Sequence, residues 1–84
     1  METYAMFAAA VAWYPEVKWA YRQGNDLVSE QHPIHIGNKW YPGRVTACFT
    51  LDGKIIRVEN YCHDHSRPFY TKEACQKSIN EAPF

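Results

Sequence analysis

Apolar and polar positions alternate most regularly between Arg44 and Tyr61, where two strand-forming runs flank Asp52-Gly53. This dipeptide is typical of a two-residue hairpin turn, because both turn positions need a positive φ. A two-residue loop pairs Phe49 with Ile56 on one side of the hairpin. That side is predicted to be apolar and to face the core, and it holds Val45, Ala47, Phe49, Leu51, Ile56 and Val58. The other side is predicted to face solvent or a partner, and it holds Arg44, Thr46, Cys48, Thr50, Ile55, Arg57, Glu59 and Tyr61.

The chain from Leu27 to Tyr41 also has the composition of a sheet. Ile34-His35-Ile36 and Lys39-Trp40-Tyr41 flank Gly37-Asn38, which predicts a second tight hairpin. Pro42-Gly43 fits the centre of a type II turn, since glycine supplies the positive φ at the third turn position. Such a turn would display the side chains of residues 40–44.

Helical patterns lie at the two ends of the chain. Residues 1–13 are rich in alanine, and Thr3 is the expected N-cap. Phe7, Ala10 and Val11 share one helical face, and so do Ala9 and Trp13, so both sets are expected in the core. Near the C-terminus, Thr71 is the expected cap of a helix over 72–80. Its buried stripe is expected to hold Ala74, Cys75 and Ile79.

Residues 16–23 fit two structures. Pro15, Glu16, Arg22 and Gly24 are placed as in a short capped helix, which is the favoured prediction. The alternative is a strand, because Val17, Trp19 and Tyr21 alternate and Gly24-Asn25 could turn the chain back onto Leu27-Val28.

These elements predict an α+β fold: an N-terminal helix, an antiparallel meander of three to five strands, and a short C-terminal helix packed on one sheet face. The length of 84 residues is enough for one domain, expected over 1–84. The apolar run from Tyr4 to Tyr14 lacks the basic start of a signal peptide and is far shorter than the roughly 20 residues that span a bilayer. No membrane association is therefore expected. Three cysteines cannot all pair within one chain, which favours the reducing cytoplasm.

The formal net charge is zero, which argues against a protein that coats DNA by charge alone. The charge is nevertheless uneven, because residues 36–72 hold six Lys or Arg and three Asp or Glu. Aromatic residues lie among these cations, a mixture that suits protein interfaces and nucleic acid alike. The predicted partner-binding residues are Trp40, Tyr41, Arg44, Arg57, Glu59 and Tyr61. A homodimer is a further option, through an exposed strand edge near Pro33.

Histidine and cysteine gather in Cys62-His63-Asp64-His65, with a second histidine pair at His32 and His35. Cys62, His63 and His65 are candidate zinc ligands, although their spacing matches no zinc-finger pattern. No phosphate loop, nucleophile elbow or catalytic carboxylate pair is present in the sequence. The protein is therefore expected to be non-enzymatic and to need no cofactor.

Residues 44–82 read as strand, Asp-Gly turn, strand and capped helix. This order resembles the strand–strand–helix unit of phage-integrase arm-binding domains, which implies a sheet that reads DNA. The likeness covers less than half of the chain, and Glu59 departs from a phosphate-binding face. In size, neutrality and aromatic content the chain resembles small accessory proteins of phages and mobile elements, including anti-defence inhibitors. The favoured hypothesis is a small binding protein or inhibitor that acts on a protein partner. Nucleic-acid binding and zinc binding at Cys62, His63 and His65 are the alternatives.

Overall fold

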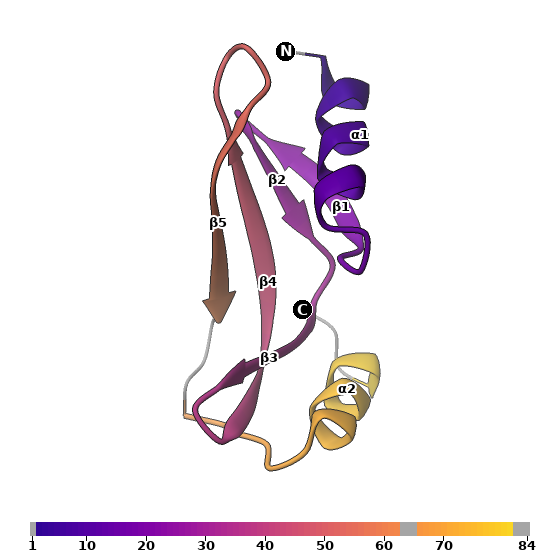
Figure 1. The fold of residues 1–84 in the computed structure, drawn as a ribbon. Helices are drawn as coiled ribbons and strands as arrows, with labels where there is room; N and C mark the ends of the chain where they lie inside the picture. Colours follow the sequence, from indigo (N-terminus) through magenta and orange to yellow (C-terminus); the bar gives the residue numbers. More distant parts are fainter. Residues whose placement is uncertain (1, 63–65, 82–84) are drawn as a thin grey trace. The chain divides into compact units, whose positions relative to one another are not determined.

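The computed structural model describes residues 2–62 and 66–81 (Figure 1). Within these ranges the elements are α1 Thr3–Trp13, β1 Trp19–Gln23, β2 Asp26–Ser29, β3 His32–Ile36, β4 Lys39–Phe49, β5 Ile55–Cys62 and α2 Lys72–Glu81. The strands form an antiparallel sheet in the order β1-β2-β4-β3, and β5 also pairs with β4. This arrangement confirms the predicted α+β class. The strands do not all pair in the order in which they follow along the chain, because β2 pairs with β4 and not with β3.

The chain divides into two compact units. Unit 1 comprises Met1–Glu30 and Val45–Glu59, and unit 2 comprises Gln31–Arg44 and Asn60–Phe84. The long strand β4 and the strand β5 each contribute residues to both units. The single domain over 1–84 stays a prediction. Neither described helix has the length and apolar character needed to cross a bilayer.

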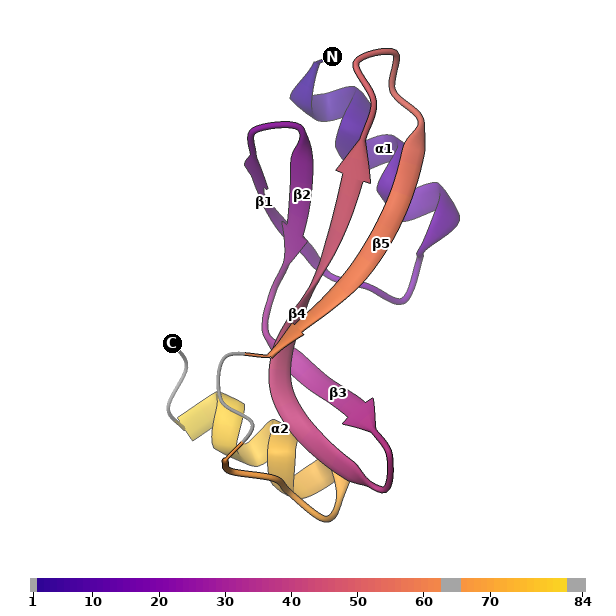
Figure 2. The same cartoon turned by 90° about the vertical axis from the view of Figure 1, so that its left-hand side faces the viewer.

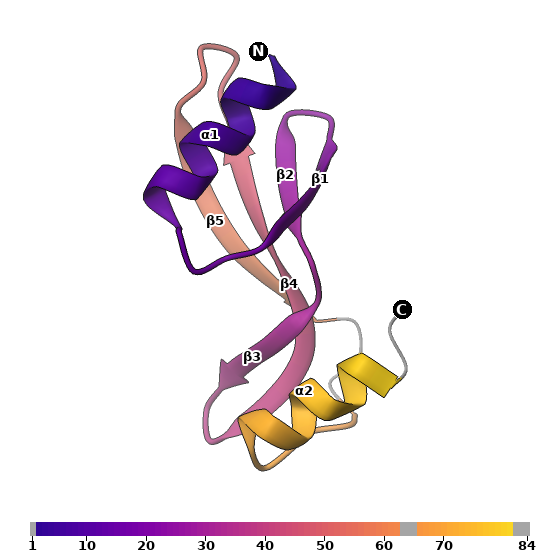
Figure 3. The same cartoon turned by 90° about the vertical axis from the view of Figure 1, so that its right-hand side faces the viewer.

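The core of unit 1 lies between α1 and one face of its strands (Figure 3). Met6 and Ala10, one helical turn apart, pack with Leu27, Ala47 and Phe49 in this core. Phe7, Ala9, Trp19, Ile55 and Val58 are partly buried against them.

Two predicted core residues of α1 are exposed. Val11 follows Ala10 by about 100° around the helix, so its side chain points away from the sheet and is 53% exposed. Trp13 is the last residue of the helix and is 76% exposed. The predicted N-cap is also wrong. Glu2 occupies that position without a side-chain cap bond, while the Thr3 hydroxyl accepts a hydrogen bond from Arg22 at 2.9 Å.

The predicted short helix over 16–23 is wrong, because residues 19–23 form β1. This strand pairs with β2, from Trp19 opposite Ser29 to Gln23 opposite Asp26. The cross-strand hydrogen bonds and the strand propensity of the aromatic residues outweigh the capping pattern. Gly24 opens the two-residue turn with φ +62°. The β3–β4 hairpin around Gly37-Asn38 is confirmed, and Gly37 opens its turn with φ +65°.

The loop between β4 and β5 is one residue longer than predicted. The N–H of Thr50 donates to the carbonyl of Lys54 at 2.8 Å, and the N–H of Gly53 donates to the carbonyl of Thr50 at 3.0 Å, so residues 51–53 form the loop. A shift of one residue moves side chains to the other face of a strand. Ile55 packs against the core and Ile56 is 64% exposed, which is the reverse of their predicted faces. Val58 packs against the core as predicted, so the regular alternation of β5 is broken between Ile55 and Val58.

Two further predictions about this hairpin are wrong for related reasons. Leu51 was predicted in the core, but it lies in the loop and is 79% exposed. Cys48 was predicted on the solvated side, but it is buried. The Arg57 side chain lies close enough to Cys48 to interact with it electrostatically, so a long polar side chain lies beside this position of β4.

In unit 2, α2 packs against β3 (Figure 1). Thr71 caps α2 as predicted, because its hydroxyl accepts the N–H of Ala74 at 3.1 Å. Cys75 and Ile79 are buried on the inner side of the helix, as predicted. Ala74 is exposed, so the buried stripe is narrower than expected.

The predicted turn at Pro42-Gly43 is absent, because both residues lie inside β4 and pair with Pro33 and His32. Gly43 serves close packing here. A Cβ atom at Gly43 would lie 2.5 Å from the carbonyl oxygen of Tyr61 and 2.7 Å from Cγ1 of Ile34. Glycine is required because the neighbouring backbone approaches too closely for any side chain.

Candidate functional site

The six predicted partner-binding residues are divided between the two units. Trp40, Tyr41, Arg44 and Tyr61 belong to unit 2, and Arg57 and Glu59 belong to unit 1. The first three were predicted at a displayed turn but lie on β4, where they are half-buried. Each unit is therefore considered as a surface of its own.

Trp40 is held from two sides in unit 2. Across the β3–β4 hairpin its indole stacks on the His35 ring, with ring centroids 4.3 Å apart and planes inclined by 10°. Its backbone exchanges two hydrogen bonds with Phe69, each of 2.8 Å. The two backbone bonds fix the position of residue 40 in the sheet, and the stack on His35 orders the indole, so a binding partner would meet a side chain that is already held on one face.

A cation and an exposed aromatic ring lie on the opposite side of β4 from the Trp40 indole, because Lys39 and Trp40 are consecutive residues of the strand. The Nζ atom of Lys39 is 5.9 Å from the centroid of the Tyr70 ring, which is within cation–π range. Tyr70 follows Phe69 directly and is 78% exposed. We call the set of His35, Lys39, Trp40, Phe69 and Tyr70 the hairpin cluster.

Trp40 was predicted as a site residue from the sequence, but the other members of the hairpin cluster were not. The pairing of His35 with Trp40 could have been found, because a two-residue turn at Gly37-Asn38 puts them opposite each other. The bridge to Phe69 joins residues that are distant in the sequence, and no local pattern indicates it.

In unit 1, Arg57 and Glu59 form an ion pair of 3.0 Å on β5. Both side chains are more than half exposed, so the pair adds little to stability. Interaction with the Cys48 side chain and the charge of the Glu59 carboxylate raise the pKa of Arg57. The surface is thus a mixture of positive and negative charge and is not a purely basic patch.

The proposed zinc ligands fall partly outside the described residues, because only Cys62 is described and His63 and His65 are not. Burial raises the pKa of Cys62, and burial together with the charge of Cys62 raises the pKa of Cys75. Both shifts favour the protonated form of each thiol in the metal-free chain. Among residues 2–62 and 66–81, no cluster of three or more His, Cys, Asp and Glu side chains is placed to hold a metal ion.

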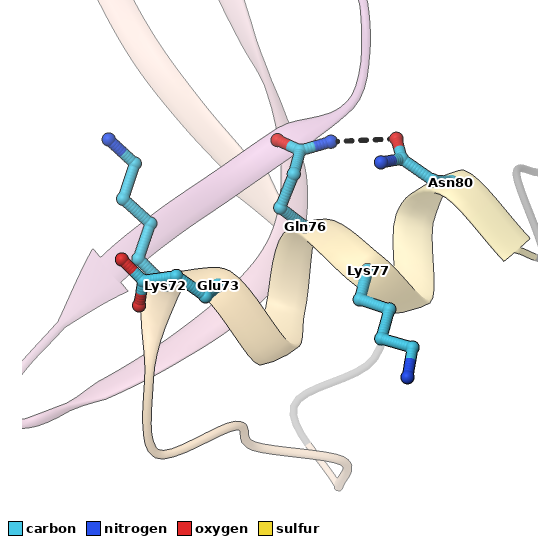
Figure 4. Close-up of a pocket in the computed structure, with 5 residues that line it drawn as sticks. All are labelled: Lys72, Glu73, Gln76, Lys77 and Asn80. Carbon is cyan, nitrogen blue, oxygen red and sulfur yellow. Dashed lines mark hydrogen bonds between the residues drawn. The ribbon is translucent and has the colours of Figure 1, made fainter.

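A shallow hollow lies beside α2, and Figure 4 shows the side chains around it. Its described lining is Lys72, Glu73, Gln76, Lys77 and Asn80. All five residues belong to one helix, and the Gln76 side chain donates a hydrogen bond to that of Asn80 at 2.9 Å. These are the solvated outer positions of an amphipathic helix, which need no ligand to explain them.

Comparison with known protein families, with curated proteins and with solved structures found no match for this chain.

Proposed function

We propose that the protein is a small non-enzymatic binding protein that recognises another protein through the hairpin cluster of unit 2. The observation that carries this proposal is the fixed placement of Trp40 between His35 and Phe69. Tryptophan and tyrosine dominate binding energies at protein interfaces. A side chain that is ordered before binding loses less entropy when the partner docks.

The charge around the cluster favours an acidic partner. Unit 2 contains five Lys or Arg residues against three Asp or Glu residues, and Lys39 lies inside the cluster itself. Tyr70 projects furthest among the aromatic members, with 78% of its surface exposed. We infer that the partner offers an apolar pocket for Tyr70 with carboxylates near the Lys39 ammonium.

One observation disfavours nucleic acid at the polar face of β5. In unit 1 the Glu59 carboxylate lies 3.0 Å from Arg57, where it would repel a phosphate. A nucleic-acid ligand at the hairpin cluster is an alternative that the experiment must distinguish from a protein partner.

All three cysteines are free thiols, which supports a reducing compartment such as the cytoplasm. A protein of 84 residues that acts by covering a partner's surface fits the role of an accessory protein or inhibitor, of the kind that phages and mobile elements carry. The role of an accessory protein or inhibitor extends the proposal and rests on the same hairpin cluster.

The test is affinity capture of partners from an extract of the native host, with the wild-type chain and with a double variant as bait. The double variant combines Tyr70→Ala with Lys39→Ala. The matched control is Tyr4→Ala in α1, because Tyr4 is 77% exposed and lies in unit 1. Loss of a central aromatic anchor costs about 2 kcal/mol, so binding should weaken about 30-fold in the double variant and remain unchanged in the control.

The capture is repeated after nuclease treatment, and circular dichroism checks that each variant is folded. Unchanged capture by the double variant would refute the assignment of the site. Loss of every bound species after nuclease treatment would instead identify a nucleic-acid ligand and refute the protein partner.

A further inference from the structure

The strand β5 has one backbone edge without a strand partner in the described part of unit 1. Among the described strands β5 pairs with β4 alone. Figure 2 shows β4 along one side of β5 and no strand along the other. Such an edge presents unpaired N–H and C=O groups to which another strand can add.

Of the usual protections of a strand edge against pairing, this edge has only its charged side chains, Arg57 and Glu59. Ile55-Ile56-Arg57-Val58-Glu59 contains no proline, glycine or lysine, and three of its five residues are β-branched. The Ile56 side chain is 64% exposed on this strand. The edge β3, by contrast, carries Pro33 and packs against α2.

The charges on β5 make this edge complementary to itself. Arg57 and Glu59 are two residues apart and lie on the same face of the strand. Their side chains are 62% and 56% exposed, so both charges are accessible to a second molecule.

We propose that β5 pairs antiparallel with β5 of a second copy of this chain, about a two-fold axis through Val58. Residues directly opposite each other in a sheet point to the same face. Consecutive residues of a strand point to opposite faces, so a residue cannot lie opposite its own chain neighbour in the second copy. The two-fold axis must therefore place one residue opposite its own copy. An axis through Val58 places Arg57 opposite Glu59 of the second copy, and symmetry repeats this pair.

The neighbouring registers are disfavoured by charge. An axis through Arg57 would place the two arginines opposite each other, and an axis through Glu59 would do the same with the two carboxylates. Like charges directly opposite each other destabilise a strand pair.

Charge reversal tests this register by sedimentation equilibrium at low salt over a concentration series. The wild-type chain should dimerise, and Arg57→Glu or Glu59→Arg alone should weaken the dimer about tenfold or more, because each creates two like-charge pairs. An equimolar mixture of the two variants should recover a heterodimer, because every facing pair is then opposite in charge. Lys18→Glu and Glu16→Arg make the same charge changes outside the strand and should leave dimerisation unchanged.

Hydrogen exchange gives a second measurement that needs no variant. Exchange of those amides of residues 55–59 that point away from β4 should slow as the wild-type concentration rises, while exchange in the loop of residues 51–53 should not. A wild-type chain that stays monomeric up to millimolar concentration would overturn the proposal. So would single variants that dimerise as strongly as wild type, or a mixture that fails to recover the dimer when each variant is folded by circular dichroism.

Discussion

Replacement of Ser29 by alanine tests how β2 and β4 are joined inside unit 1. Ser29 is fully buried, and its hydroxyl accepts the N–H of Val45 at 2.8 Å and donates to the carbonyl of Glu30 at 2.8 Å. Alanine keeps nearly the same volume but removes the acceptor of the Val45 N–H. A buried donor that loses its partner costs about 1–3 kcal/mol. The free energy of unfolding should fall by about that amount, and Tm should fall by about 4–20 °C for a chain of this size.

Urea unfolding followed by tryptophan fluorescence and circular dichroism measures this change. Hydrogen exchange adds a local readout, because the Val45 amide should exchange faster in Ser29→Ala. The control is Ser78→Ala, which removes a half-buried hydroxyl from α2 in unit 2. A Ser29→Ala chain within about 0.5 kcal/mol of wild type, with unchanged exchange at Val45, would show that this hydrogen bond does not join the strands.

Two further predictions concern unit 2. Thr71→Ala removes the cap of α2 and should lower the free energy of unfolding, measured in urea, by about 0.5–2 kcal/mol. Thr71→Ser keeps the hydroxyl and should retain most of the wild-type stability. Equal stability of the three chains would argue against the cap. Burial, and to a lesser degree the Lys72 charge, lowers the pKa of His32 below 6.5, so the unfolded chain binds the proton more readily than the folded one. The contribution of neutral His32 to stability is present above about pH 6.5 and is lost as the pH falls toward the folded-state pKa. The difference in stability between wild type and His32→Gln should therefore shrink as the pH is lowered from about 7 to about 5, and a constant difference would contradict the shift.

The predictions that were confirmed concern residues that interact with close neighbours in the sequence. The Gly37-Asn38 turn lies between the residues that it pairs, and the Thr71 hydroxyl caps a helix that begins at the next residue. A helix at each end of the chain followed from the same kind of local pattern. For the site, Trp40 could be predicted from its residue type and its position beside basic residues.

Several of the predictions that failed depended on contacts between distant residues. Residues 19–23 became a strand because β2 and then β4 extend the sheet beside them. Gly43 looked like a turn residue, but its lack of a side chain accommodates Tyr61 and Ile34. The hairpin cluster was incomplete for the same reason, since Phe69 reaches Trp40 from a separate part of the chain.

By itself, the sequence determined the α+β class, the helices at both ends, the Gly37-Asn38 hairpin and the apolar character of the sheet core. Propensity, capping and alternation act over a few residues and can be recognised locally. Only the tertiary structure decided which isoleucine of β5 faces the core and which residues surround Trp40. Strand register depends on the loop length, and a single added residue reverses the faces of the adjacent Ile55 and Ile56, so small local differences determine which side chains meet.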